Sequence, residues 1–109
     1  EQVITEFDNV SCDVFSGLLV DFAKQNRASV IVKGLRTVAD FEYELQTAQT
    51  NALLSKEALD TVFFATSLEF AYLSSSSVKE IASFGGDISM CVPDFVAKLV
   101  YEKYGHKSE

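Results

Sequence analysis

The sequence is poor in the residues that most often carry metal, disulfide or nucleophilic chemistry. Its 109 residues include no Trp, one Pro, one His and two Cys. His106 has no Cys or second His close to it, so zinc-type spacing and a Ser-His-Asp set are both excluded. Cys12 and Cys91 lie in apolar surroundings with no ligand spacing, and we expect reduced, buried thiols rather than a disulfide.

Long hydrophobic runs and positive charge are also scarce. No run of about 18 apolar residues is present, and the N-terminus lacks the basic and apolar pattern of a signal peptide. Sixteen acidic residues against nine basic ones give a net charge of −7, whereas a nucleic-acid binder normally presents a basic face. We therefore expect a cytoplasmic protein with no membrane and no nucleic-acid partner.

What the sequence does contain is an alternation of strand and helix patterns. Short β-rich runs predict strands over residues 11–15, 28–32 and 61–65, and apolar spacing predicts helices over 17–26, 37–54, 74–84 and 92–104. This order predicts an α/β fold with a parallel sheet in one domain, followed by a flexible tail over 105–109. The continuous apolar run at 28–32 predicts a strand buried on both faces.

Finer expectations concern the helix ends and faces. Thr37 is a candidate N-cap, Ser77 with Glu80 a capping box, and Gly85 a C-terminal stop. The helix over 37–54 carries one apolar stripe, formed by Val38, Phe41, Leu45, Ala48 and Ala52. The last helix is expected to turn four apolar side chains inward: Phe95, Val96, Leu99 and Val100.

Two polar segments follow the predicted strands, where open α/β sheets bind ligands. Lys33-Gly34-Leu35-Arg36 flanks a glycine with two cations and precedes a helix, a pattern suited to phosphate. Solvated cations are an equally good interpretation. The run of serines from Ser74 to Ser77 suits either helix capping alone or anion binding.

Three longer motifs in order carry a family resemblance. The first spans residues 30–46, V-I-V-K-G-L-R-T-V-A-D-F-E-Y-E-L-Q. The second is Y-L-S-S-S-S-V-K-E at 72–80. The third is F-G-G-D-I-S at 84–89 followed by Val92-Pro93. Together they closely resemble the motifs of bacterial phosphopantetheine adenylyltransferases, which implies a Rossmann-like nucleotidyltransferase fold.

The resemblance also implies an activity and its residues. The family transfers an adenylyl group from ATP to 4′-phosphopantetheine, which gives dephospho-coenzyme A and pyrophosphate, with Mg²⁺ accompanying ATP and usually as a homohexamer. Carried over, the catalytic residues are Arg36, Ser75 and Ser76, and the substrate phosphopantetheine faces Leu19 and Lys33. ATP is expected at Gly34, Leu35, Arg36, Glu44, Phe70, Ala71, Tyr72, Leu73, Ser74, Ser75 and Ser76. No residue is assigned to a metal.

Two departures from the family pattern qualify this picture. The H-x-G-H motif is absent, so we expect the chain to be the C-terminal two thirds of one incomplete domain, unstable and inactive without the missing part. Lys33 stands where the family usually has arginine, which predicts weaker or less oriented binding of the substrate phosphate. The alternative is an inactive fragment that only binds nucleotide or coenzyme A, or only mediates oligomerisation.

Overall fold

The computed structural model describes residues 1–105, and His106 with most of the predicted tail lies outside that range. Its elements are a 3-10 turn at Gln2–Ile4, α1 (Leu19–Gln25), β1 (Val30–Leu35), α2 (Val38–Leu54), β2 (Asp60–Ala65), a 3-10 turn at Leu68–Phe70, α3 (Ser75–Ser83) and α4 (Asp94–Tyr104). They form two compact units, one of Glu1–Lys33 with Ala39–Phe64, the other of Gly34–Val38 with the chain from Ala65 onward. Among residues 1–105, none of the helices combines the length and the hydrophobicity of a membrane span.

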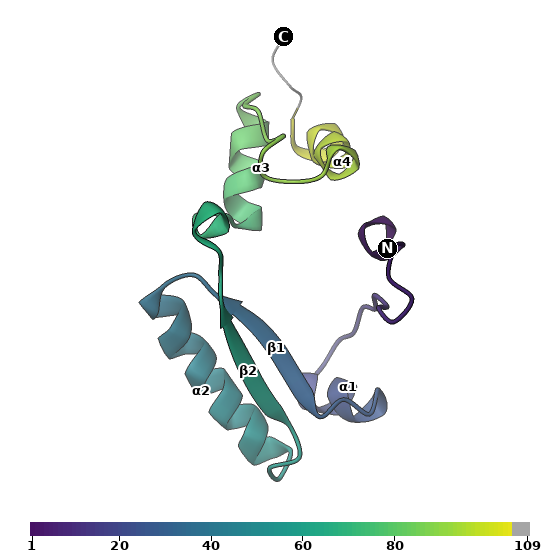
Figure 1. The fold of residues 1–109 in the computed structure, drawn as a ribbon, viewed down its shortest axis with the longest axis vertical. Helices are drawn as coiled ribbons and strands as arrows, with labels where there is room; N and C mark the ends of the chain where they lie inside the picture. The colour runs from purple at the N-terminus through teal and green to yellow at the C-terminus, as the bar shows by residue number, and fades with distance from the viewer. Residues whose placement is uncertain (106–109) are drawn as a thin grey trace. The chain divides into compact units, whose positions relative to one another are not determined.

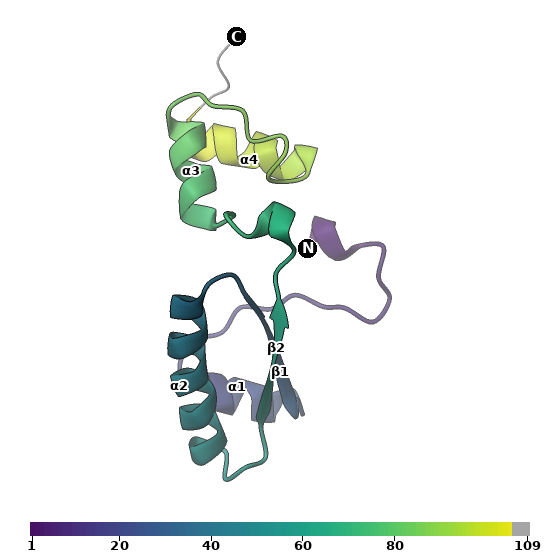
Figure 2. The same ribbon diagram turned by 60° about the vertical axis from the view of Figure 1, so that its left-hand side comes forward.

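The first unit is built on a parallel β–α–β arrangement, which confirms the predicted α/β class (Figure 1). The Asp60 amide donates to the Ser29 carbonyl at 3.0 Å, and the Thr66 amide donates to the Leu35 carbonyl at 2.9 Å. Both pairs have the same sequence offset, so the strands run in the same direction. Helix α2 lies along the sheet in both views, and Phe41 meets Phe63 of β2 edge to face at 6.1 Å (Figure 2).

Two expectations about this unit are wrong. Residues 11–15 form no strand, since no strand of the described chain lies beside them to receive their hydrogen bonds; Phe15 instead stacks on Phe22 of α1 at 4.3 Å. Strand β1 is not buried on both faces, because Val30 is 46% and Val32 64% exposed. In this two-stranded sheet α2 covers one face, and no described element of the same unit covers the alternate residues.

The predicted apolar stripe of α2 is only partly buried. Ala48 and Ala52 are half-buried, whereas Val38 is 77% exposed and Phe41 and Leu45 also stay exposed. The same pattern recurs on α4, where Phe95, Val96 and Val100 are half-buried and Leu99 is exposed, which corrects the inward position expected for Leu99. A helical stripe predicts which side chains share a face but not how much of that face a neighbour covers.

The second unit has its own small core between α3 and α4. Val78, Ala82, Ile88 and Ala97 are buried there, and five half-buried side chains surround them: Leu73, Cys91, Val92, Val100 and Tyr101. Cys91 is thus half-buried, but Cys12 is exposed, contrary to the expectation of two buried thiols. Cys12 lies in the stretch at 11–15 that has no covering element.

Helix α3 begins and ends with well-defined caps. Ser74 is the N-cap, and its side chain and that of Ser77 each accept from the other's backbone amide at 3.2 Å. The capping box is therefore Ser74 with Ser77, not Ser77 with Glu80 as expected, because the helix begins at Ser75. Gly85 ends the helix as predicted, with a φ of 75° that favours glycine.

The Tyr101 hydroxyl bridges the loop that follows α3. It donates to the Gly86 carbonyl at 2.7 Å and accepts from the Ile88 amide at 3.1 Å. We expect Tyr101→Phe to lower the free energy of unfolding by about 1–3 kcal/mol, since the carbonyl of half-buried Gly86 and the amide of buried Ile88 lose their partner. Urea unfolding followed by circular dichroism measures this.

The matched control is Tyr43→Phe on α2, because Tyr43 is 69% exposed and its hydroxyl makes no hydrogen bond within residues 1–105. Equal stability of the two variants would show that the bridge contributes nothing.

Candidate functional site

The first predicted site segment lies at the end of β1, but not where the sequence placed it. Lys33, Gly34 and Leu35 belong to the strand rather than following it, because the ladder to β2 continues through the Thr66 amide to the Leu35 carbonyl. Gly34 has no left-handed φ; a Cβ there would lie 3.4 Å from Thr66 Oγ1. A Cβ at this position would therefore be at the close limit of ordinary van der Waals contact, so neither backbone freedom nor lack of space requires glycine here.

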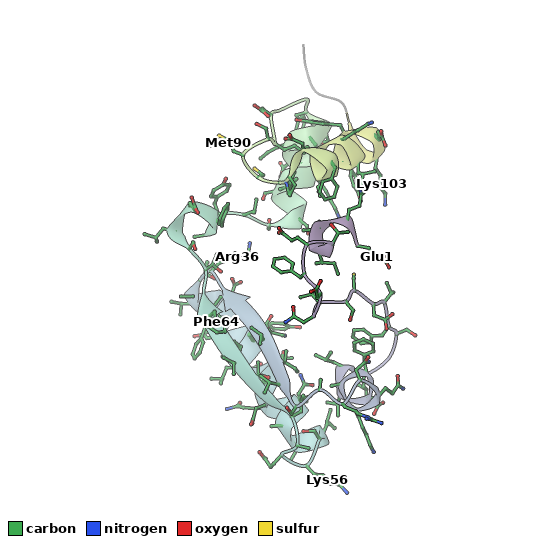
Figure 3. All side chains as sticks on the ribbon, turned by 45° about the vertical axis from the view of Figure 1, so that its right-hand side comes forward. Glu1, Arg36, Lys56, Phe64, Met90 and Lys103 are labelled. Carbon is green, nitrogen blue, oxygen red and sulfur yellow. The ribbon has the colours of Figure 1, made fainter. Side chains whose placement is uncertain are left out.

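Arg36 connects the two predicted site segments. Its Nη1 donates to the Leu73 carbonyl at 2.6 Å, so the residue after β1 holds the loop that follows β2. Figure 3 shows Arg36 at the end of the strands. Both residues belong to the second unit. A guanidinium is planar with five donors, and fixing one of them orients the rest. The structure thus brings together Arg36 and Leu73, one residue from each predicted segment.

The loop itself carries Phe70, Ala71, Tyr72 and Leu73. A 3-10 turn covers Leu68–Phe70, and the Leu73 amide donates to the Phe70 carbonyl at 3.0 Å, which folds the loop back on itself. Tyr72 is exposed, and its hydroxyl lies 3.9 Å from Cys91 Sγ. The hydrogen bond with Cys91, the charge at that residue, desolvation and the charge of Glu69 together raise the pKa of Tyr72 above its usual 10.0.

The four serines divide into two pairs with different roles. Ser74 and Ser77 are occupied with each other, since their hydroxyls also lie 3.0 Å apart. Ser75 and Ser76 are exposed, and among residues 1–105 neither their hydroxyls nor their backbone amides make a hydrogen bond. Helix capping and anion binding are therefore not alternatives here, because the capping pair leaves the other pair available at a helix N-terminus.

A groove of 360 Å³ adjoins this helix start. Ser74, Ser75 and Lys79 supply its polar rim, and its apolar walls are Leu73, Val78, Val92, Val96 and Val100. Lys79 was not predicted as a site residue, although its spacing of four from Ser75 places both on one helix face. The groove offers an apolar surface next to unpaired donors and a cation, which suits an anionic ligand with an apolar part.

Lys33 and Glu44 form an ion pair within the first unit. Lys33 Nζ donates to Glu44 Oε2, from β1 to α2, and both side chains are about a quarter exposed (27% and 24%). The sequence assigned these residues to different ligands and did not predict their contact. The contact could have been predicted from the alternation of side chains along β1, because Lys33 points to the same face as the half-buried Ile31 and Leu35, which is the face that α2 covers.

The remaining predicted residue, Leu19, begins α1 and is half-buried. It shares the first unit with Lys33 and Glu44, while Arg36 and the serines belong to the second. Within residues 1–105 no group of three His, Cys, Asp or Glu side chains is placed to hold a metal ion.

Comparison with known proteins tests the family resemblance of the sequence motifs. Residues 1–81 match the family model described as cytidylyltransferase-like. A phosphopantetheine adenylyltransferase from Lachnoclostridium phytofermentans is 56% identical over 110 residues, covering 100% of this chain and 67% of its own length. The enzyme of the same name from Dictyoglomus thermophilum is 50% identical, with 98% of this chain and 65% of its own length covered.

A third relative of that name, from Clostridium botulinum, is 46% identical and again aligns with 100% of this chain and 66% of its own length. The chain thus spans about two thirds of the length of the curated relatives it matches. With identity at this level over nearly the whole chain, the chain belongs to the cytidylyltransferase-like family, among the phosphopantetheine adenylyltransferases.

Proposed function

We propose that this chain is part of an enzyme that transfers an adenylyl group from ATP to 4′-phosphopantetheine. An oxygen of the pantetheine phosphate attacks the α-phosphorus of ATP, the bond from that phosphorus to the β-phosphate bridge breaks, and pyrophosphate leaves. Dephospho-coenzyme A is the other product. No covalent enzyme intermediate is formed, which agrees with a site whose predicted members include no activated nucleophile.

The observation that carries this proposal is the junction of Arg36 with the loop that leads into α3. It places a guanidinium in the same unit as a helix start with two unpaired serine hydroxyls and amides. In phosphoryl-type transfer most of the catalytic effect comes from positioning and from stabilising charge spread over phosphate oxygens. Arg36, Ser75 and Ser76 have the right chemistry for that role.

The other residues are proposed to bind and orient. Gly34 and Leu35 would contact the nucleotide through their backbone, and Phe70 to Ser74 would flank it. Lys33 would receive the pantetheine phosphate next to Leu19. The Lys33–Glu44 pair implies that Glu44 orients the ammonium as well as lying near the nucleotide.

Magnesium enters this proposal only as the ion that accompanies ATP. The described residues do not form a carboxylate cluster for it, and phosphate oxygens are its usual ligands in such sites. When bound it would neutralise charge on the phosphates. We further propose that coenzyme A can occupy the same site as a product analogue, and that the assembled enzyme is a homo-oligomer, a hexamer by resemblance.

One observation favours a second candidate, a module that binds nucleotide or partner chains but does not turn over. The sheet face opposite α2 exposes Val30, Val32, Val62 and Phe64 by 46%, 64%, 42% and 61%. An apolar face of this kind normally lies against another polypeptide. On this reading the chain contributes a binding surface and the chemistry requires residues that it does not contain.

The role of Arg36 can be tested by measuring ATP affinity calorimetrically on the 109-residue chain. We expect Arg36→Ala to weaken ATP binding about 10- to 100-fold, since a charge-assisted contact is lost. Lys98→Ala removes one positive charge from the exposed side of α4 and serves as the control, with unchanged affinity. Equal affinity of the Arg36→Ala and Lys98→Ala variants would remove Arg36 from the site.

The lysine at position 33 predicts a gain of function. Lys33→Arg is expected to bind phosphopantetheine about three- to tenfold more tightly. A guanidinium can keep the ion pair with Glu44 and still donate two parallel hydrogen bonds to the phosphate. Lys33→Gln, which removes the charge and keeps a polar end group, should bind more weakly than the parent chain. If Lys33→Arg binds no better, residue 33 does not hold the phosphate.

Pyrophosphate release in the presence of ATP, Mg²⁺ and phosphopantetheine separates the two candidates. We expect no release from the 109-residue chain alone, and release after addition of the third of the L. phytofermentans relative that lies outside the alignment. Turnover by the chain alone would contradict the need for further residues. Tight association of the two polypeptides without turnover would favour the binding module.

A further inference from the structure

A cavity of 570 Å³ lies at the ends of β1 and β2 where the strands begin, away from the end that carries Leu35 and Arg36. Its walls are the turn from α1 into β1 and the turn from α2 into β2, and both belong to the first unit. The Asp60 amide donates to the Ser29 carbonyl and fastens the two turns side by side. We propose that this cavity binds a small organic phosphate with an apolar body, at a site separate from the one described above.

The two turns have the same unusual backbone. In each, two backbone amides that follow the helix donate to carbonyls of its last turn. After α1 the Arg27 amide donates to the Lys24 carbonyl and the Ala28 amide to the Ala23 carbonyl. After α2 the Lys56 amide donates to the Leu53 carbonyl and the Glu57 amide to the Ala52 carbonyl. The residue that such a cap holds in the left-handed region is normally glycine. Here it is Arg27 and Lys56, each with a φ of 55°.

Helix α3 provides the comparison within the same chain. It ends in the same cap, with Gly85 donating to Ala82 and Gly86 to Ile81, and glycine occupies the left-handed position. The two caps that line the cavity therefore accept a backbone cost that the third avoids. A cation at a helix C-terminus recovers part of this cost through the helix dipole, but the capped carbonyls here already have amide partners.

The charges at the cavity are unbalanced. Lys24, Arg27 and Lys56 line it together with one acid, Asp21, in a chain whose net charge is −7. Within residues 1–105 none of these three cations makes an ion pair or hydrogen bond through its side chain. Three exposed cations from two adjacent turns form an anion-attracting rim.

The floor of the cavity is apolar. Ala23 and Leu59 are buried there, and Val20 and Leu54 continue the surface. A volume of this size matches sites for small organic ligands rather than for a bare ion. The rim would hold a phosphate through Arg27 and the two ammonium groups, while the floor covers an aromatic or aliphatic body.

Titration of ¹⁵N-labelled 109-residue chain with phenyl phosphate tests the proposal, with inorganic phosphate and benzyl alcohol as partial probes. Amide shifts should concentrate at residues 27–29 and 55–59, and phenyl phosphate should bind about tenfold more tightly than either partial probe. The double variant Arg27→Gly/Lys56→Gly should lose at least about tenfold in affinity, while its melting temperature stays equal or rises because glycine suits the left-handed turn.

Two controls separate charge from backbone effects. Glu57→Gly relaxes a third left-handed residue, with a φ of 64°, that does not line the cavity; because it removes a negative charge next to Lys56, it should not weaken binding. Lys56→Gln keeps the backbone conformation but removes the charge, and should weaken binding. Shifts confined to residues 74–79, equal binding by the parent chain and the double variant, or equal affinity for phenyl phosphate and benzyl alcohol would each overturn the proposal.

Discussion

The parallel pairing of β1 with β2 is the interaction on which the other features depend. Its two terminal hydrogen bonds, from Asp60 to Ser29 and from Thr66 to Leu35, fix the register of the strands at both ends. At one end the pairing sets the spacing between the residue after β1 and the loop after β2, so that Arg36 can reach the Leu73 carbonyl. At the other end it sets the two cationic turns beside each other.

The two ends of this sheet present phosphate-suited chemistry in different ways. At the end where the strands finish, a guanidinium and a helix N-terminus supply donors, which is the common arrangement in α/β proteins. Where the strands begin, the helices present their C-termini, and the positive character comes from side chains alone. The Lys33–Glu44 pair lies between α2 and the sheet and is charge-balanced, unlike either end.

The second unit shows how a short segment can serve structure and binding at once. Ser74 and Ser77 satisfy each other and define where α3 begins, and the core of Val78, Ala82, Ile88 and Ala97 holds that helix against α4. Because those two serines complete the cap, Ser75 and Ser76 are left with unused donors at the helix start. The apolar groove beside them is the edge of the same core.

The sequence by itself determined the α/β class, the order and approximate positions of the four helices and of the two strands that form, the glycine stop at Gly85, and the two segments that carry the candidate site; it placed the end of β1 too early. These follow from local signals: hydrophobic period, cap residues and motif order. Only the tertiary structure decided that residues 11–15 are not a strand and that one face of β1 is exposed, since both depend on which neighbour is present to pair or cover. Contacts between distant residues, such as Arg36 with Leu73, Lys33 with Glu44, and the two cationic turns with each other, also came from the structure alone, because strand register and helix placement bring them together and no local pattern encodes them.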